Sequence, residues 1–237
     1  ADTGAVTLAD TAGVVLDVNG QTETIGTLTG GAAAGISLGA GALTVTQGAD
    51  ATVAGVISGT GASSLTKAGA STLTLSGANT YTGTTNVNAG TLSVTAANAL
   101  HTGSSLVVNG GTLDINNVML NTLAGASVQG MGQGGVGAIT GTGAGAQYDG
   151  AITLAGASTV GAATGGGTDI LTLNGVLGGA GIGLTKVGAG TLVLGGANTY
   201  TGGTNVNGGT LKLGAGGVRA DTGAVTLADT AGVVLDV

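Results

Sequence analysis

The chain repeats a long stretch of its own sequence. LTKAGASTLTLSGANTYTGTTNVNAGTLSV, residues 65–94, aligns without a gap with LTKVGAGTLVLGGANTYTGGTNVNGGTLKL, residues 184–213. The last eighteen residues, 220–237, are identical to residues 1–18. Repeats that cannot bury an apolar face alone bury it by stacking on their neighbours. The internal repetition therefore favours a stacked repeat architecture over an ordinary globular domain.

The two kinds of repeat also divide the chain. The internal copies are offset by 119 residues and the identical ends by 219. We interpret residues 1–219 as one repeat period with sub-repeats at about 1–100 and 101–219, and residues 220–237 as the start of the next period. On this interpretation the chain is one unit plus an overhang from a longer tandem array. An engineered duplication of the ends would give the same pattern.

Alternating residues predict β-strands. In TLTL, residues 72–75, the leucines fall on one side and the threonines on the other, and GTLDINN, residues 111–117, alternates in the same way. Such runs end in Gly or Asn, which are turn residues, and the chain has 53 glycines. Helix-favouring residues are scarce. We therefore expect an all-β fold.

The composition decides between β architectures. Phe and Trp are absent and there are only three tyrosines, so the core must be built from Ala, Val, Leu and Ile. Small aliphatic side chains suit the narrow interior of a β-solenoid, whereas an outer-membrane barrel needs aromatic girdles. The chain has no run of eighteen apolar residues, so no transmembrane helix is predicted. We expect a Gly-rich solenoid with about 20 residues per rung and roughly 11 rungs per period.

The two copies carry a family resemblance. SLTKAGASTLTLSGANTYTGTTNVNAGTL and GLTKVGAGTLVLGGANTYTGGTNVNGGTL resemble the passenger-associated (autotransporter-associated β-strand) repeat of bacterial autotransporter passenger domains. The shared pattern is Leu-Thr-Lys, Gly-Thr-Leu-x-Leu, Gly-x-Asn-x-Tyr-x-Gly-x-Thr and Gly-x-Leu. The resemblance implies a right-handed parallel β-helix that is exported across the outer membrane and displayed at the cell surface. The Gly-rich residues 119–150 fit no clean rung.

Several motif positions have structural interpretations. Asn79 and Asn198 precede a Thr-Tyr-Thr-Gly corner, where an Asn side chain can satisfy turn backbone groups. The offset of 119 residues places the two corners about six rungs apart along the axis. The motif leucines are expected to line the core: Leu65, Leu73, Leu75, Leu184, Leu192 and Leu194.

The tyrosines and lysines of the motif are expected to be structural as well. We expect Tyr81 and Tyr200 to cover the corner, since one tyrosine per copy makes no platform for stacking a sugar. Lys67 and Lys186 recur at one motif position, and we expect solvated charges that soften a strand edge. Neither pair is expected to carry catalysis.

A search for chemistry yields no catalytic, metal-binding or cofactor-binding residues. The net charge of −7 disfavours a nucleic-acid partner, and the absence of Cys excludes thiolate metal sites. The Asp residues are scattered singly, and the lone His101 precedes a turn. GMGQGG, residues 130–135, matches G-x-G-x-x-G formally but lacks the flanking strand and helix of a nucleotide site. No cofactor is expected.

Three function classes follow. We favour a structural extracellular fibre, or a surface adhesin or stalk, built from tandem units that stack end to end. The alternative is a binding module that recognises a glycan or an ice-like surface through threonine-rich faces. A β-helix polysaccharide-degrading enzyme is least supported. The expected partners are the chain itself, other cells or surface glycans, without nucleic acid.

The duplicated ends provide the predicted junction. A solenoid that stops within an array leaves unpaired N–H and C=O groups on its terminal rungs. We expect the first rung of one unit to continue the last rung of the previous unit, through covalent linkage or end-to-end contact. The junction residues are Val6, Leu8, Val14, Leu16, Val225, Leu227, Val233 and Leu235.

Overall fold

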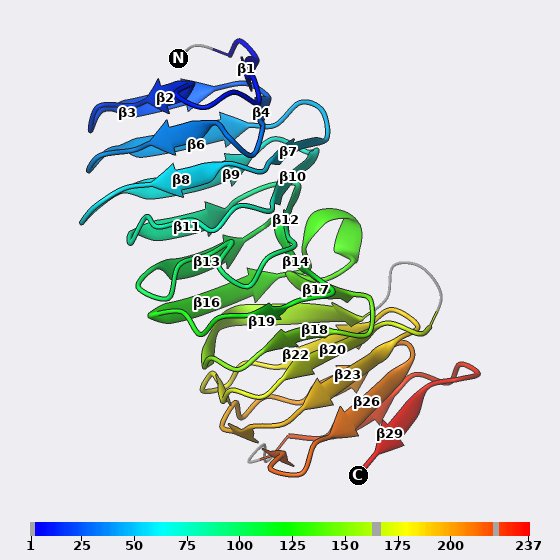
Figure 1. Ribbon diagram of the computed structural model, residues 1–237. Helices are drawn as coiled ribbons and strands as arrows, with labels where there is room; N and C mark the ends of the chain where they lie inside the picture. Colours follow the sequence, from blue (N-terminus) through cyan, green and yellow to red (C-terminus); the bar gives the residue numbers. More distant parts are fainter. Residues whose placement is uncertain (1–2, 163–166, 220–222) are drawn as a thin grey trace.

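The computed structural model describes residues 3–162, 167–219 and 223–237. These residues form an all-β parallel solenoid of about 11 turns, with the two termini at opposite ends of the column (Figure 1). This confirms the predicted fold class. Helix in the described part is limited to a short 3₁₀ turn, η1 (Gln133–Gly135), and no described helix is long and apolar enough to cross a bilayer.

Each turn of the solenoid contributes to three stacks of short parallel strands, which we call faces A, B and C. Face A contains β3 (Thr22–Ile25), β6 (Ala42–Thr46), β9 (Ser64–Ala68), β11 (Thr84–Val87), β13 (Ser105–Asn109), β16 (Gly125–Gly130), the start of β19 (Ile152–Ala162), β21 (Leu177–Gly178), β24 (Ala197–Asn198) and β27 (Val218–Arg219). Face B contains β1 (Val6–Leu8), β4 (Leu28–Gly30), β7 (Ala51–Val53), β10 (Thr72–Leu75), β12 (Thr91–Val94), β14 (Thr112–Asn116), β17 (Ile139–Thr142), the end of β19, β22 (Leu184–Val187), β25 (Thr204–Val206) and β28 (Val225–Leu227).

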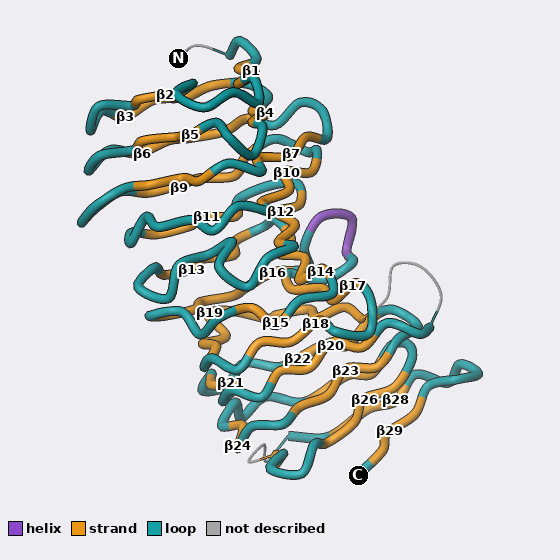
Figure 2. Tube along the Cα trace, in the orientation of Figure 1, coloured by secondary structure: helices purple, strands orange, loops and turns teal. Residues whose placement is uncertain are grey.

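Face C contains β2 (Val15–Asp17), β5 (Gly35–Ser37), β8 (Val56–Ser58), β15 (Met119–Leu120), β18 (Ala146–Tyr148), β20 (Ile170–Leu173), β23 (Thr191–Leu194), β26 (Thr210–Leu213) and β29 (Val234–Asp236). Between β8 and β15, residues 79–80 and 97–99 continue this face through backbone bonds without forming strands. Figure 2 shows the strands stacked along the column.

Rung length varies along the chain. Thr22 pairs with Ala42 and Ala42 with Ser64, so a rung takes 20 or 22 residues there, whereas the pairing of Ser158 with Leu184 takes 26. Residues 119–150, which the sequence did not fit to a rung, form β15 to β18 with η1 between them. A backbone hydrogen bond anchors the loop at η1, since Gln133 N donates to Thr112 Oγ1 at 2.8 Å.

The interior consists of ladders of like side chains. On face B, Leu73 pairs with Leu92 and Leu92 with Leu113, and all three are at most 1% exposed. Each buried Leu stabilises the fold by about 2 kcal/mol relative to an exposed one. Alternation explains the pattern, because successive side chains of a strand point to opposite sides. The core is therefore one mainly aliphatic column, one rung wide.

The two identical end segments occupy the same faces. β1 and β28 have the same sequence and are the first and last of the eleven strands of face B, so ten turns separate them. β2 and β29 are likewise identical, and both lie on face C. The 219-residue offset therefore corresponds to a whole number of turns.

Candidate functional site

The lysine of each repeat copy lies inside the column. Lys67 pairs with Val45 on one side and Val87 on the other, within an inward-facing ladder, and is 0% exposed. The expectation of a solvated, edge-softening lysine was therefore wrong. The alternation that points Leu65 inward also points Lys67 inward. The core tolerates the charge because the side chain reaches polar groups at the corner between faces A and B.

The Lys67 ammonium binds three backbone carbonyls. It donates to Ala68 O at 2.9 Å, Gly69 O at 2.7 Å and Ala89 O at 3.0 Å. These carbonyls belong to the corners of two successive turns, so the lysine ties the turns together. All three N–H donors are used, as a buried ammonium requires. Burial lowers the pKa of Lys67 from 10.5 to about 8, an effect that Asp50 partly opposes.

The second copy repeats this arrangement. Lys186 lies between Val160 and Val206 and is 0% exposed. Its ammonium donates to the carbonyls of Val187, Gly188 and Gly208 at 2.9, 2.7 and 2.9 Å. Burial lowers the pKa of Lys186 to about 8 as well. A buried lysine with three carbonyl partners is thus a property of the repeat.

The asparagines replace ladder bonds where the chain leaves the strand conformation. Asn79 Oδ1 accepts from Ile57 N at 2.8 Å, and its Nδ2 donates to Ala99 O at 2.6 Å. Asn198 Oδ1 accepts from Leu177 N at 2.9 Å, while its buried Nδ2 has no partner among the described residues. Asn79 therefore joins three successive turns, and Asn198 joins two.

The tyrosines are buried at the same corner. Tyr81 shares a hydrogen bond of 2.5 Å with Thr85, and Tyr200 shares one of 2.8 Å with Thr204. Both rings are 0% exposed, so neither can stack on a sugar. Burial raises the pKa of Tyr81 to about 12, and the bond to Thr85 opposes the shift. The six motif leucines are also 0% exposed: Leu65, Leu73, Leu75, Leu184, Leu192 and Leu194.

The two motif copies do not lie on one line. β9 and β10 of the first copy lie on faces A and B, whereas β22 and β23 of the second lie on faces B and C. The copies are thus five whole turns and one face apart, instead of the six rungs expected. The longer rungs between them, with 26 residues from Ser158 to Leu184, account for the rotation.

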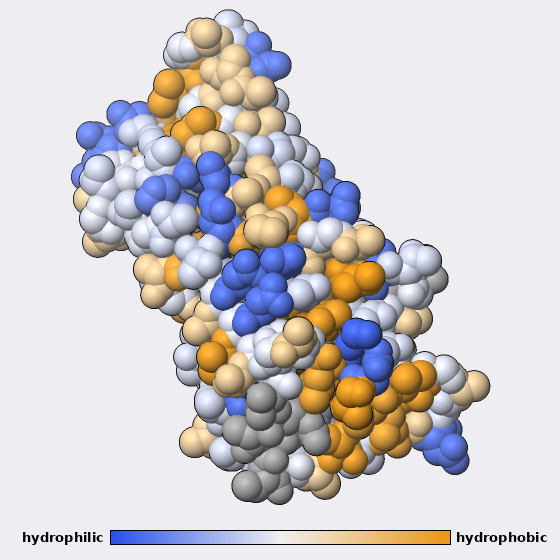
Figure 3. All heavy atoms as spheres, turned by 60° about the horizontal axis from the view of Figure 1, so that its bottom comes forward, coloured by the Kyte–Doolittle hydropathy of each residue, from blue (hydrophilic) through white to orange (hydrophobic). Residues whose placement is uncertain are grey.

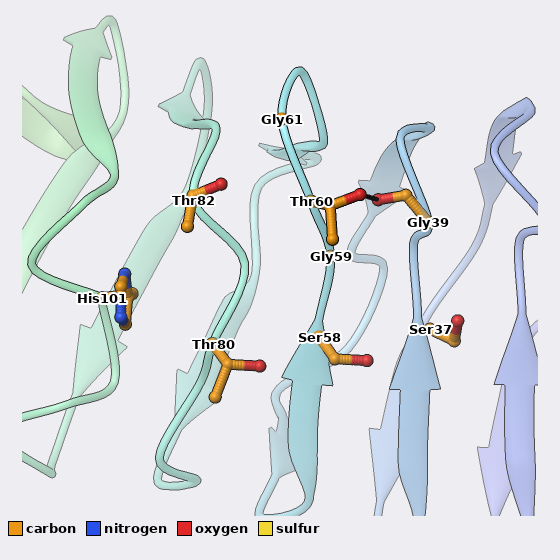
Figure 4. A pocket seen from close by; sticks show the side chains of 9 residues that line it. All are labelled: Ser37, Gly39, Ser58, Gly59, Thr60, Gly61, Thr80, Thr82 and His101. Carbon is orange, nitrogen blue, oxygen red and sulfur yellow. Dashed lines mark hydrogen bonds between the residues drawn. The ribbon is translucent and has the colours of Figure 1, made fainter.

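A polar groove runs across successive rungs beside face C (Figure 4). It has a volume of about 580 Å³ and is lined by serine, threonine and glycine residues together with His101. Ser37 and Ser58 are paired neighbours, and Thr80 follows in the next turn. A second hollow of about 320 Å³ adjoins it and shares Thr80 and His101. His101 Nδ1 accepts from Gly103 N at 3.0 Å.

The junction residues lie at the two ends of the column. Val6, Leu8, Val14 and Leu16 are half-buried at the N-terminal end, as are Val225, Val233 and Leu235 at the other end, and Leu227 is 42% exposed. A concavity of about 250 Å³ at the N-terminal end is lined in part by Leu16, Ile25 and Leu43. Figure 3 shows hydrophobic atoms gathered near the C-terminal end. Residues 1–2 and 220–222 of the duplicated segments lie outside the described residues.

Within the described ranges, no group of three or more His, Cys, Asp or Glu side chains could hold a metal ion. Asp114 accepts bonds from Ser93, Thr140 and Thr142, which occupies its carboxylate in a structural network.

Comparison with known families identifies the repeat. The model of the passenger-associated-transport-repeat matches residues 65–94 and 184–213, the two stretches that contain the buried lysine, asparagine and tyrosine. No curated protein and no solved structure matches the chain. The two matches confirm the resemblance seen in the sequence. They fit an autotransporter passenger domain with β-solenoid repeats, which implies a secreted or surface-exposed domain.

Proposed function

We propose that this chain, which carries two passenger-associated transport repeats, is one period of a surface-exposed structural rod. The rod extends by stacking rungs and has no catalytic role. In this proposal residues 1–219 form the period and residues 220–237 begin the next one.

One observation carries the proposal: the identical end segments occupy faces B and C at both ends, ten turns apart. A following period can therefore begin where this one ends without changing its position around the axis. Ten rungs at about 4.8 Å each add about 48 Å per period. The two internal copies lack this property, since they are one face out of phase.

Chains of two and three periods test the proposal. In the in-phase design, Val237 is followed by residues 19–219, so that the eighteen-residue segment occurs once at each junction. The matched control joins whole 237-residue chains, so that the segment occurs twice and adds two extra faces.

We expect electron microscopy to show straight rods that lengthen by about 48 Å per added period in the in-phase design only. The control should bend or loop out at each junction. In-phase chains that fold back into side-by-side units, or equal behaviour of both designs, would contradict the rod.

The polar groove supports glycan binding as a second candidate function. Thr80 and Thr82 lie on its wall with hydroxyls for which the described part of the chain shows no partner (Figure 4). Ser37, Ser58 and Thr80 come from successive turns about 4.8 Å apart, and their hydroxyls can both donate to and accept from a sugar chain. Binding to immobilised glycans that is lost in Thr80→Val, and kept in Thr74→Val on another face, would support this function. The rod itself does not depend on it.

A further inference from the structure

The N-terminal segment covers the second turn through a defined set of contacts. Val6 N donates to Thr27 O at 2.8 Å, and Gly35 N donates to Val14 O at 2.9 Å. The side chain of Asp10 adds a bond, since its Oδ1 accepts from Ala33 N at 2.7 Å. One edge of the segment, residues 3–18, is therefore paired with the turn below it.

The C-terminal segment has the same sequence but is paired on its opposite edge. β28 pairs with β25 and β29 with β26, both of which belong to the preceding turn. Asp229 is the counterpart of Asp10; it is exposed, and no hydrogen bond to it occurs among the described residues. Leu227 is 42% exposed, whereas its counterpart Leu8 is half-buried. The edge that binds the second turn in the N-terminal segment is thus unused here.

If two copies stacked end to end with both segments in place, which we call plain stacking, the contacts at this edge would be unfavourable. Plain stacking would place β1 of one copy on β28 of the other in identical register, with Asp17 beside Asp236 and Asp10 beside Asp229. Like charges in directly adjacent strand positions are destabilising. Stacking would also leave the Asp229 carboxylate without the backbone partner that Asp10 has.

Strand exchange avoids these costs. If residues 223–237 of one copy replace residues 4–18 of another, identical side chains and backbone groups can remake the contacts that residues 4–18 lose. The donated segment is then paired on both edges, and Leu227 takes the half-buried position of Leu8. Exchange of identical elements between chains is a low-cost route to association, and addition of a strand supplies main-chain bonds.

We infer that separate copies of this chain join end to end by strand exchange, the C-terminal segment of one copy displacing the N-terminal segment of the next. Val225 then pairs with Leu28 of the second copy, and Asp229 accepts the bond from its Ala33. The inference deepens the proposed rod by naming its partner, a second copy, and rests on that proposal only for continuous stacking of rungs.

Disulfide trapping tests the exchange, because the chain contains no cysteine. Thr7 pairs with Thr29, and Thr226 is the counterpart of Thr7. Exchange brings Thr226 of one copy beside Thr29 of another, whereas plain stacking brings it beside Thr7. Neighbouring strand positions lie within the Cα separation that a disulfide allows.

Three double variants of the full chain are oxidised with glutathione disulfide, which accepts the two electrons and two protons of the thiols. We expect Thr29→Cys/Thr226→Cys to give a ladder of covalent oligomers on a non-reducing gel. The control Thr7→Cys/Thr29→Cys should close within one chain and stay monomeric. A ladder from Thr7→Cys/Thr226→Cys instead, or reduced monomers from the exchange pair, would overturn the inference.

A second measurement uses the two aspartates without cysteine chemistry. Asp229→Ala should weaken self-association in sedimentation about tenfold, because it removes a carboxylate hydrogen bond made only after exchange. Asp10→Ala should strengthen it, because it loosens the segment that must leave. Shifts in the same direction would rule exchange out. The length of the covalently joined periods tests the rod separately, so the two proposals fail independently.

Discussion

The buried lysines show how a chain with few charges uses them. Two of its four cationic side chains, Lys67 and Lys186, lie in the core and bind the carbonyls of tight corners. Gly69 O and Gly188 O follow directly after strands β9 and β22, and the lysines supply hydrogen-bond donors to them. Breaking such a contact leaves buried acceptors unpaired, which costs about 1–3 kcal/mol for each group.

The lowered pKa of these lysines predicts an unusual pH dependence. The folded chain releases these protons near pH 8, whereas the unfolded chain keeps them to about 10.5. Between these values the unfolded state binds more protons, so the free energy of unfolding should rise with pH. The slope has an upper limit of about 1.4 kcal/mol per pH unit for each lysine.

Urea unfolding between pH 7.5 and pH 10 measures this effect. Above pH 10, Tyr81 should lower the free energy of unfolding as the pH rises. Burial raises its pKa to about 12, so the folded chain keeps a proton that the unfolded chain has released. Lys67→Met/Lys186→Met is the control and should flatten the rise. A slope that is unchanged in this variant would show that other groups cause it.

At the scale of the element, the asparagine side chains supply hydrogen bonds between turns where the chain forms no regular strand. Asn79 bonds to Ile57 N and Ala99 O, but Asn198 bonds only to Leu177 N among the described residues. We therefore expect Asn79→Ala to destabilise the fold by about 1–3 kcal/mol more than Asn198→Ala, since it leaves one more buried partner unpaired.

Chemical denaturation of both asparagine variants provides the comparison. Asn86→Ala is a suitable control, because Asn86 is half-buried and its bond to Thr66 is a long 3.4 Å. Equal losses from Asn79→Ala and Asn198→Ala would indicate that the bond to Ala99 adds nothing.

The strands were predictable from the sequence, and so was the inward direction of the lysine, although the opposite was expected. Alternation located β10 and β14 and assigned their leucines to one side. The same alternation places Lys67 on the side of Leu65, and the general preference of charges for water was wrongly given more weight. The carbonyl cluster that holds Lys67 comes from two turns 22 residues apart, so it becomes visible only when the turns are stacked.

Two further features could not be predicted from the sequence: the rotation of one repeat copy relative to the other, and the polar groove. An offset of 119 residues fixes a face only if every rung has the same length, and the rungs around η1 and β19 are longer. The groove arises because Ser37, Ser58 and Thr80 come from different turns with no shared sequence motif. Neither feature can be derived from a single turn, because both depend on how successive turns stack.

At the scale of the whole molecule, stacking predicts that a complete turn can be removed. Deleting residues 43–64 joins Ala42 to Leu65, which then pairs with Glu23 in place of Leu43. We expect the shortened chain to keep its parallel β-structure and to unfold cooperatively, because each rung contacts only its neighbours.

The matched control deletes residues 43–53, which removes only part of a turn. This change rotates the later rungs against β3 and β4, so the N-terminal turns should lose protection in hydrogen exchange. Similar protection in the two deletion chains would mean that the faces tolerate a shift in phase.

The whole-turn period has a consequence for what an array displays. Because ten turns return the chain to the same face, every outward side chain of the proposed rod would recur on one side of the column, at intervals of about 48 Å. A surface group of this rod would form a straight row instead of a spiral. Any ligand carried at a matching spacing meets several copies at once, and weak single contacts then add up through a raised effective concentration. The length of the period would therefore determine the spacing of the sites that a multivalent ligand can bind at the same time.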